Sequence, residues 1–416
     1  MNSKSPEFKQ KALQWASNHE VFCLLDSNHY NDEYGKFNFL IAAGKQDYIQ
    51  GNAGEEAFEQ LKLFYAKHQN WMFGYFGYDL KNEVENLQSH NPDYLHFPDL
   101  YFFVPEYLIV SKEGMVEVII GNQSVIEEIE RMDVVSIPDN FNIPIKARVN
   151  KQSYVNTVEE IKTHILRGDI YEINYCQEFY SEESQLDPIL VYRKLTTLSP
   201  TPFSGFFKIG SHFILSASPE RFICKKENKL ISQPIKGTAR KSSDVVEDLI
   251  LRDRLRDDAK QQAENVMIVD LVRNDLTKSA VPGSVKVNEL FGVYSFSHVH
   301  QMISTISCEL DPRTHFIDAI KKSFPMGSMT GAPKIRALEL IEQFESMKRG
   351  TYSGAMGYIS DNQDFDFNVL IRSIFYNSAQ SYLSFHVGGA ITYASDPEDE
   401  YQECMLKASA ILKTLE

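Results

Sequence analysis

The sequence lacks several features, and each absence excludes a class of protein. No run of about 18 apolar residues occurs, so we expect no membrane-spanning segment and no membrane partner. The start, MNSKSPEFKQ, has no apolar core of the kind found in secretory signals. The five cysteines are scattered without a CxxC pair, which argues against a zinc site and a disulfide framework. These absences predict a cytoplasmic protein, since a reducing compartment suits unpaired cysteines.

The chain also lacks a surplus of basic residues. Its formal net charge is −15, from 42 Lys and Arg against 57 Asp and Glu. Nucleic-acid binding depends on clustered Lys and Arg, so we expect no nucleic-acid partner. A small anionic substrate is still compatible with this charge, because local basic groups can outweigh the overall field.

The sequence does contain alternating strand-like and helix-like patterns. Residues 136–147 carry two prolines and no helical period, and are the best candidate linker. We therefore divide the chain into residues 1–145 and 150–416, intertwined into one large unit. Aromatic and β-branched runs before the linker predict strands at 21–25, 37–42, 71–78, 101–110 and 116–120.

After the linker, strands are predicted among amphipathic helices. The predicted helices are 153–167, 253–272, 334–344 and 399–415. The predicted strands are 171–179, 205–209, 212–217, 221–224, 354–360, 368–376 and 382–387. This order predicts an α+β fold in which antiparallel sheets are covered by helices.

Lys236 is the most informative single residue. It lies in residues 233–240 (QPIKGTAR), at the predicted end of a strand and directly before Gly and Thr. There an ammonium group can lose solvent, and desolvation would lower its pKa and make it a nucleophile. The alternative is a solvated lysine at a turn, which is the commoner situation for lysine.

Glu220 lies just before the segment that carries Lys236, in residues 218–222 (SPERF). If the two residues lie on adjacent antiparallel strands, they can flank one small ligand. A buried carboxyl group has a raised pKa and can act as a general acid. The alternative is a surface Glu–Arg pair at a strand start.

Three more glutamates are candidate metal ligands. Glu264 lies on a strongly apolar helix, where a carboxylate must be paired or metal-bound. Glu400 and Glu403 are one helical turn apart, and a cation near them would relieve their repulsion. Oxygen ligands and partial hydration suit Mg²⁺. An acidic first turn that complements the helix dipole is the alternative for Glu400 and Glu403.

Two basic residues are candidate anion contacts. Lys334 follows a glycine-containing loop, residues 324–333, where backbone N–H groups and a helix N-terminus would attract an anion. An ordinary helix start with a proline in the first turn explains this loop equally well. Arg372 interrupts an apolar strand, 367–376, and such an arginine often grips a carboxylate with two bonds.

The order of these motifs resembles the chorismate-utilising enzymes, which include anthranilate, aminodeoxychorismate and isochorismate synthases. SPERF, PIKGT, AENxMIVDLxRND, GAPK and SDPExEYxE occur in that order between about residues 153 and 415. Residues 22–27 and 74–79 resemble the first domain of this family more loosely. The resemblance implies an anthranilate synthase component I-like fold, a chorismate site and Mg²⁺ on the C1 carboxylate.

The resemblance also implies roles for individual residues. Glu264 and Glu403 match metal ligands, with Glu400 close by. The implied substrate contacts are Thr238, Gly331, Lys334, Tyr352, Arg372, Gly388 and Gly389.

Two positions distinguish the branches of the family. Glu172 stands where isochorismate synthases have a water-activating lysine, which argues against water as the nucleophile. Lys236 stands where anthranilate synthases have alanine, and matches the aminodeoxychorismate synthase branch. In the implied mechanism Lys236 attacks C2 while Glu220 protonates the departing C4 hydroxyl. Ammonia then adds at C4 and expels the lysine, giving 4-amino-4-deoxychorismate.

The sequence departs from the family at Gln301, where a histidine is usual. The neighbouring His300 is expected to be structural, because adjacent strand residues point to opposite faces. The sequence shows no Cys-His-Glu amidotransferase segment, so a separate glutamine amidotransferase is implied, together with a lyase that completes 4-aminobenzoate for folate synthesis. Residues 22–27 resemble a tryptophan-holding segment, which allows a bound tryptophan. The rival functions are anthranilate synthase component I and a non-catalytic chorismate-binding subunit.

Overall fold

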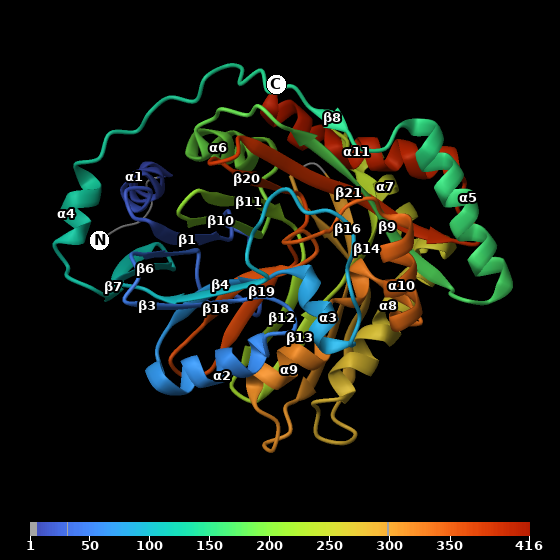
Figure 1. The fold of residues 1–416 in the computed structure, drawn as a ribbon, viewed down its shortest axis with the longest axis horizontal. Coiled ribbons are helices and arrows are strands. Elements are labelled where there is room, and N and C mark those ends of the chain that lie inside the picture. The colour runs from blue at the N-terminus through green and yellow to red at the C-terminus, as the bar shows by residue number, and fades with distance from the viewer. Residues whose placement is uncertain (1–5, 31, 298) are drawn as a thin grey trace.

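Two antiparallel sheets stacked on each other form the centre of the computed structural model, which describes residues 6–30, 32–297 and 299–416 (Figure 1). The order of the first sheet is β17 (Gly331–Ala332), β9 (Glu172–Ser181), β21 (Tyr382–Thr392), β20 (Ser373–Asn377), β11 (His212–Ser218), β10 (Phe203–Ile209), β1 (Val21–Asp26), β2 (Phe39–Ala43), β6 (Tyr107–Lys112) and β7 (Met115–Ile120), with β8 (Lys146–Ala147) on β9. The order of the second is β14 (Ile235–Arg240), β16 (Val299–Glu309), β13 (Lys229–Gln233), β12 (Arg221–Lys226), β19 (Phe365–Asn368), β18 (Ala355–Ile359), β4 (Met72–Phe76), β5 (Leu100–Val104) and β3 (Asp47–Gly51), with β15 (Lys286–Ser295) on β16.

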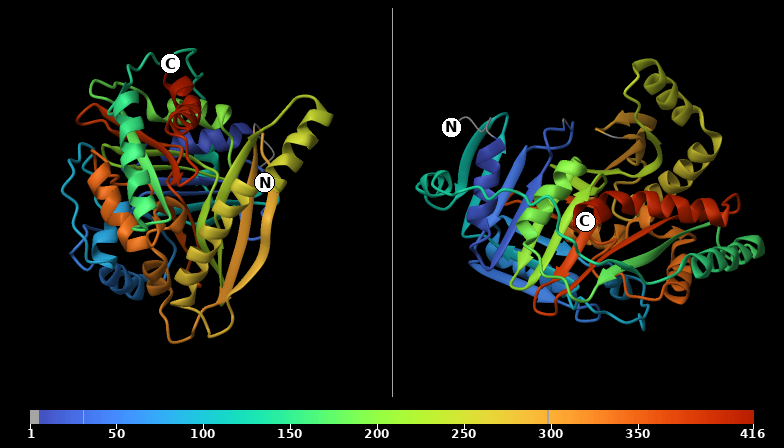
Figure 2. Two further views of the ribbon diagram at one scale, coloured as in Figure 1. Left: turned by 90° about the vertical axis from the view of Figure 1, so that its right-hand side faces the viewer. Right: turned by 90° about the horizontal axis from the view of Figure 1, so that it is seen from above.

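Helices cover the outer faces of both sheets. The first sheet is covered by α1 (Pro6–Ala16), α4 (Val125–Glu130), α5 (Lys151–Arg167), α6 (Pro188–Leu198), α10 (Lys334–Phe344) and α11 (Pro397–Leu415). The second is covered by α2 (Ala57–His68), α8 (Ala259–Thr277) and α9 (Phe316–Ser323), while α3 (Lys81–Val84) lies between β4 and β5 in the chain. Figure 2 shows α7 (Val245–Asp257) projecting away from the body of the molecule.

Alternation along the strands places the first sheet between two apolar cores. On β1, Val21 and Cys23 join the core shared with the second sheet, while Phe22 and Leu24 join the core under the outer helices. Successive strand side chains point to opposite faces, so both faces of this strand are buried. Between the sheets, the rings of Tyr75 and Phe207 pack edge to face with centroids 5.5 Å apart. The predicted α+β fold is therefore confirmed.

The predicted elements were right in type more often than in extent. Helix 334–344 has the predicted bounds, whereas the predicted helix 253–272 is divided between α7 and α8. Asp258 causes the division, because its extended backbone ends α7 and its side chain caps α8 by accepting the N–H of Gln261. The predicted strand 101–110 is divided into β5 and β6 around Pro105, which lacks an N–H for the ladder.

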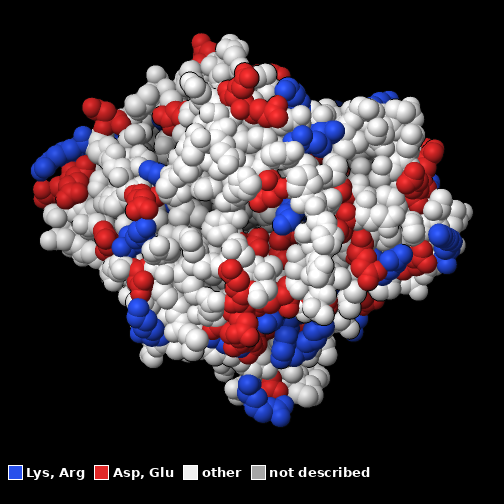
Figure 3. Space-filling model, viewed as in Figure 1, with Lys and Arg blue, Asp and Glu red and all other residues white. Residues whose placement is uncertain are grey.

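The strands that come from residues 1–145 are built into both sheets. β1 pairs with β10 on one side and β2 on the other, and β4 lies between β18 and β5. Within the described residues, no helix is both long and apolar enough to cross a bilayer. On the face shown in Figure 3, basic side chains lie among acidic ones rather than in a continuous patch.

Candidate active site

Lys236 lies at a β-bulge on β14. Ile235 is opposite Ile303 and Thr238 is opposite Gln301, so β14 has one residue more than β16 across this interval. Gly237 accommodates the bulge with a φ of 99°, a conformation that favours glycine. Because β14 continues along the edge of β16 after β13, Lys236 is not at a strand end as predicted. Bulges commonly re-aim a side chain beside an active site.

The Lys236 ammonium donates a hydrogen bond to Glu172 Oε1, with Nζ and Oε1 2.8 Å apart. Only 11% of the Lys236 side chain is exposed. Burial by itself would lower the pKa of this ammonium, but the carboxylates of Glu172, Glu264 and Glu220 outweigh burial and the pKa is raised. The predicted lowering of the pKa is therefore wrong, because it considered desolvation without the acidic groups that the fold brings to the lysine.

Glu220 is buried directly before β12, opposite the junction of β13 and β14. Its Oε1 accepts a hydrogen bond of 2.6 Å from Ser328 Oγ, at a short helical turn, η2 (Gly327–Met329). Burial raises the pKa of Glu220 to about 7, despite the opposing effects of Ser328 and Lys236. The predicted raised pKa is confirmed, and the alternative of a surface Glu–Arg pair is wrong.

Glu264 and Glu400 face one lysine that the sequence analysis did not single out. Lys260 Nζ lies 3.9 Å from Glu264 Oε1 and 3.9 Å from Glu400 Oε1, which brings α8 and α11 together. Burial raises the pKa of both glutamates. Of the two expectations for Glu264, paired or metal-bound, the structure shows an ion pair with Lys260, and metal binding stays a prediction. The spacing of four residues from Lys260 to Glu264 was the available signal for this pair.

The three glutamates suit a divalent cation by chemistry but do not form a closed cage. Glu403 is drawn to Lys407, with Oε1 and Nζ 2.7 Å apart. Among the described residues, no group of three or more His, Cys, Asp and Glu side chains is arranged to hold a metal. Carboxylate oxygens are the ligands that Mg²⁺ prefers. A cation bound there would replace Lys260 as the positive charge that neutralises Glu264 and Glu400.

Lys334 is buried at the start of α10 and its ammonium is already engaged. Nζ lies 2.6 Å from Asp275 Oδ2 and 2.8 Å from the Pro325 carbonyl oxygen. Burial lowers the pKa of Lys334 despite the neighbouring Asp275. The ammonium is therefore not free for an anion in this structure, which corrects the interpretation of this loop as an open anion site. A contact from Lys334 to substrate stays a prediction.

Arg372 lies between β19 and β20, not within one continuous strand as predicted. Its φ of 53° breaks the extended backbone at this point. Nη1 donates to the Lys407 carbonyl oxygen at 3.1 Å, and no ion pair of Arg372 with a carboxylate is found among the described residues. Burial lowers the pKa of Arg372. The guanidinium is thus near α11 with donors left to offer.

The other predicted substrate contacts lie around the same strands. Gly331 and Gly388 approach the neighbouring backbone so closely that a Cβ would meet a carbonyl oxygen of β9 at 2.2 and 2.0 Å. Gly389 is beside the Glu400 carboxylate: a Cβ added to Gly389 would lie 3.3 Å from Glu400 Oε2. Tyr352 is buried, 3.3 Å from Cys176 Sγ through its hydroxyl. Thr238 is exposed on β14.

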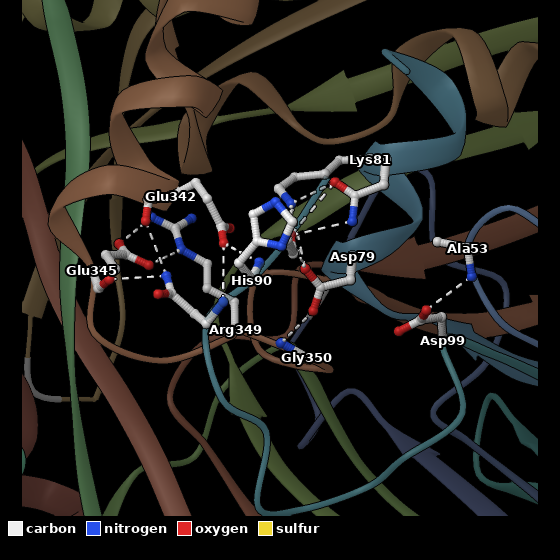
Figure 4. Close-up of polar contacts among 12 residues, drawn as sticks. Ala53, Asp79, Lys81, His90, Asp99, Glu342, Glu345, Arg349 and Gly350 are labelled. Carbon is white, nitrogen blue, oxygen red and sulfur yellow. Dashed lines mark hydrogen bonds and ion pairs between the residues drawn. The ribbon is translucent and has the colours of Figure 1, made fainter. Parts of the chain in front are cut away.

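A buried ion network supports the segment that carries Tyr352 (Figure 4). Arg349 makes two bonds to Glu345, at 2.6 and 2.9 Å, and a third to the Asn174 carbonyl of β9 at 2.8 Å. Asp79, from the segment 74–79, accepts the Gly350 N–H at 3.1 Å. The network therefore ties the N-terminal region to the strand that carries Glu172.

Gln301 and His300 have different surroundings. His300 is buried with Nδ1 2.8 Å from Ser295 Oγ and Nε2 3.0 Å from Asp248, so both of its ring nitrogens are engaged away from Lys236. Gln301 is buried opposite Thr238, and its Oε1 has no hydrogen-bond partner among the described residues.

Comparisons with known proteins identify the family of this chain. Residues 20–413 match the model of the chorismate binding enzymes. Aminodeoxychorismate synthase component 1 of Escherichia coli is 34% identical over 84% of this chain and 77% of its own length. Anthranilate synthase component 1 of Aquifex aeolicus is 27% identical over 94% and 89%. The crystal structure of anthranilate synthase component I from Streptococcus pneumoniae superposes with a TM-score of 0.78, at 26% identity, over 92% of this chain and 93% of that one. The chain is an enzyme that belongs to the chorismate binding family.

Proposed function

We propose that this enzyme aminates chorismate to 4-amino-4-deoxychorismate through a covalent bond to Lys236. The carrying observation is that the largely buried Lys236 side chain interacts electrostatically with Glu220, a buried carboxyl group whose pKa is raised to about 7. A carboxyl group with that pKa is protonated in much of the population near neutral pH and can act as an acid. Relatives named aminodeoxychorismate synthase component 1 support the same choice.

The proposed reaction has two substitution steps. Lys236 Nζ attacks C2 of chorismate, the ring double bonds shift, and the C4–O bond breaks as Glu220 gives its proton to the departing oxygen. Ammonia then attacks C4, the double bonds shift back, and the lysine leaves from C2. Dividing one difficult substitution into two easier ones is the advantage of a covalent intermediate.

We assign Glu264, Glu400 and Glu403 as the residues that would hold Mg²⁺. The bound ion would neutralise the C1 carboxylate of the substrate. Arg372, Tyr352, Thr238, Lys334 and the backbone at Gly331, Gly388 and Gly389 are the proposed substrate contacts. The donors that Arg372 has left support a carboxylate contact, because guanidinium and carboxylate match in geometry.

The proposed partner is a glutamine amidotransferase that supplies ammonia, and a separate lyase would complete 4-aminobenzoate for folate synthesis.

We also propose tryptophan as a ligand near β1. A cavity of about 170 Å³ lined by Leu24, Asp26, Tyr192 and Arg193 supports this proposal, although Lys9 already pairs with Asp26 at 2.5 Å. The cysteines, all buried and free, support a cytoplasmic location.

Product analysis tests the proposal. The enzyme is incubated with chorismate, Mg²⁺ and ammonium, with and without an added lyase, and a parallel sample contains EDTA. We expect 4-amino-4-deoxychorismate, its conversion to 4-aminobenzoate only with the lyase, and no product with EDTA. Anthranilate as the sole product would show the rival synthase activity instead.

The variant Lys236→Ala tests the covalent role. It should lose the 4-amino product because no nucleophile remains, while chorismate binding measured by calorimetry stays largely intact. Lys226→Ala, at the half-buried last residue of β12, is the control and should keep activity. Unchanged turnover in Lys236→Ala would remove this lysine from the mechanism.

A further inference from the structure

Glu172 is held rigidly against the proposed nucleophile. It is 1% exposed, and its backbone is paired on both sides, with Thr392 of β21 and Ala332 of β17. One carboxylate oxygen lies 2.8 Å from Lys236 Nζ. The other, Oε2, is buried and has no hydrogen-bond partner among the described residues. A buried acceptor without a partner is costly, so its retention calls for an explanation.

We propose that Glu172 is a catalytic residue that takes a proton from Lys236 before the lysine attacks, an inference that rests on the proposed function. An ammonium group has no lone pair, so Lys236 must lose a proton before it can form a bond to carbon. Glu172 is the carboxylate that contacts the reacting nitrogen. Glu172 belongs to the first sheet and Lys236 to the second, so the proton would pass from one sheet to the other.

The other carboxylates that face Lys236 are less suited to this task. They are Glu220, before β12, Glu264 on α8 and Glu403 on α11. Glu220 is held by Ser328 and must keep its own proton for the leaving oxygen. Glu264 and Glu403 are paired with Lys260 and Lys407. Neither they nor Glu220 form a hydrogen bond with Lys236 Nζ among the described residues.

The protons balance over the whole cycle. Glu172 carboxylate takes one proton from the Lys236 ammonium, leaving a neutral amine and a carboxylic acid. Formation of the N–C2 bond and loss of C4 oxygen as water, with the proton from Glu220, leave a positively charged secondary amine. Ammonia adds at C4 and the lysine departs as a neutral amine, so the charge moves to the product. Glu172 then returns its proton to Lys236, and the new ammonium group of the product gives a proton back to Glu220, so both acids regain their starting states.

The variant Glu172→Gln tests the transfer, because glutamine keeps the size and a hydrogen-bonding oxygen but accepts no proton. Purified enzyme is mixed with chorismate and Mg²⁺ without ammonia, quenched at intervals, and the lysine adduct is followed by intact-protein mass spectrometry. We expect adduct formation to slow by roughly 10² or more at neutral pH. Its rate should also rise about tenfold per pH unit, as the fraction of free amine does.

Three further variants make the result decisive. Glu178→Gln changes another buried carboxylate on β9. Glu178 pairs with Arg148, with Oε2 and Nη2 2.9 Å apart, and not with Lys236, so this variant should keep the wild-type rate. Glu172→Asp keeps a carboxylate and should show the wild-type pH profile at a reduced rate. Lys236→Ala should form no adduct. Thermal unfolding confirms that each variant is folded.

The outcomes separate this inference from the proposed function. Two results for Glu172→Gln would overturn the role of Glu172 and leave the lysine mechanism standing. One is adduct formation at the wild-type rate, and the other is a rate of adduct formation reduced by the same factor at every pH. The role of Glu172 would also be overturned if folded Glu172→Asp showed the pH profile that we expect for Glu172→Gln. Absence of both adduct and 4-amino product in the wild-type enzyme would instead overturn the proposed function.

Discussion

At the scale of single residues, the pKa values of both reacting side chains are raised, but for different reasons. Glu220 has no cationic partner within hydrogen-bonding distance among the described residues, so desolvation dominates and its pKa rises to about 7. Lys236 is also buried, but Glu172 contacts it and keeps the ammonium form. Glu220 in its protonated form can give a proton to the leaving oxygen, and Lys236 has an adjacent acceptor, Glu172, for the proton that it must lose.

The pKa of Glu220 predicts the pH dependence of the reaction. A general acid acts only when protonated, so kcat/KM for chorismate should fall as the pH rises through about 7. Glu220→Gln should lose roughly 10²- to 10⁴-fold in kcat/KM and no longer show that limb. Steady-state assays from pH 5.5 to 9 measure both effects. Glu227→Gln, in the exposed turn after β12, should keep the wild-type profile, and a limb retained in Glu220→Gln would assign it to another group.

At the scale of elements, the connection from α10 to β18 depends on a charge buried inside the protein. Arg349 is only 2% exposed, pairs with Glu345, and lies over the ring of Tyr78 at 4.6 Å. Glu345 also accepts the N–H of Cys176 on β9 at 2.9 Å. Because the pair joins α10, β9 and the segment around Tyr78, its loss should loosen the wall that holds Tyr352.

The variant Arg349→Met should destabilise the folded protein strongly. Removing one partner leaves the Glu345 charge buried and uncompensated, which costs roughly 3–5 kcal/mol in the free energy of unfolding. Urea denaturation followed by fluorescence measures the change. Arg131→Met breaks an ion pair in which both side chains are largely exposed and should change the stability little. Adding Glu345→Gln to Arg349→Met should recover part of the loss, and an equal loss in the double variant would contradict this explanation.

At the scale of the whole molecule, the two regions predicted from the linker share both sheets. β1, β2, β6 and β7 extend the first sheet beyond β10, and β4, β5 and β3 extend the second beyond β18. Without them, the inner edges of β10 and β18 would expose backbone groups and apolar faces that are now buried. The site lies in residues 150–416, but its supports include Asp79 from the N-terminal region.

A fragment of residues 150–416 should therefore fail to fold by itself. We expect it to be largely insoluble, or soluble without a cooperative thermal transition, because the core between the sheets is left open. Circular dichroism and chorismate binding test this, with the full chain as the control. A fragment that melts cooperatively and binds chorismate would show that the catalytic region is an independent domain.

Particular segments show how far sequence patterns can predict this structure. The bounds of helix 334–344 were predicted correctly because a proline precedes it and helix-forming residues fill it. The strand predicted at 368–376 was wrong in extent, because an apolar run does not reveal the turn at Arg372, with its positive φ. Lys260 was missed because a lysine on a helix is usually solvated, and its two glutamate partners lie on separate helices.

The sequence by itself determined the fold class, the family and the presence of a lysine in the PIKGT motif, because these depend on local patterns and ordered motifs. Only the tertiary structure decided what surrounds Lys236. Glu172 is 64 residues away in the chain and lies in the other sheet, yet its carboxylate contacts the lysine and raises its pKa. A pKa depends on the charges that are close in space, so a motif can identify the lysine as a candidate nucleophile but not reveal where its proton goes.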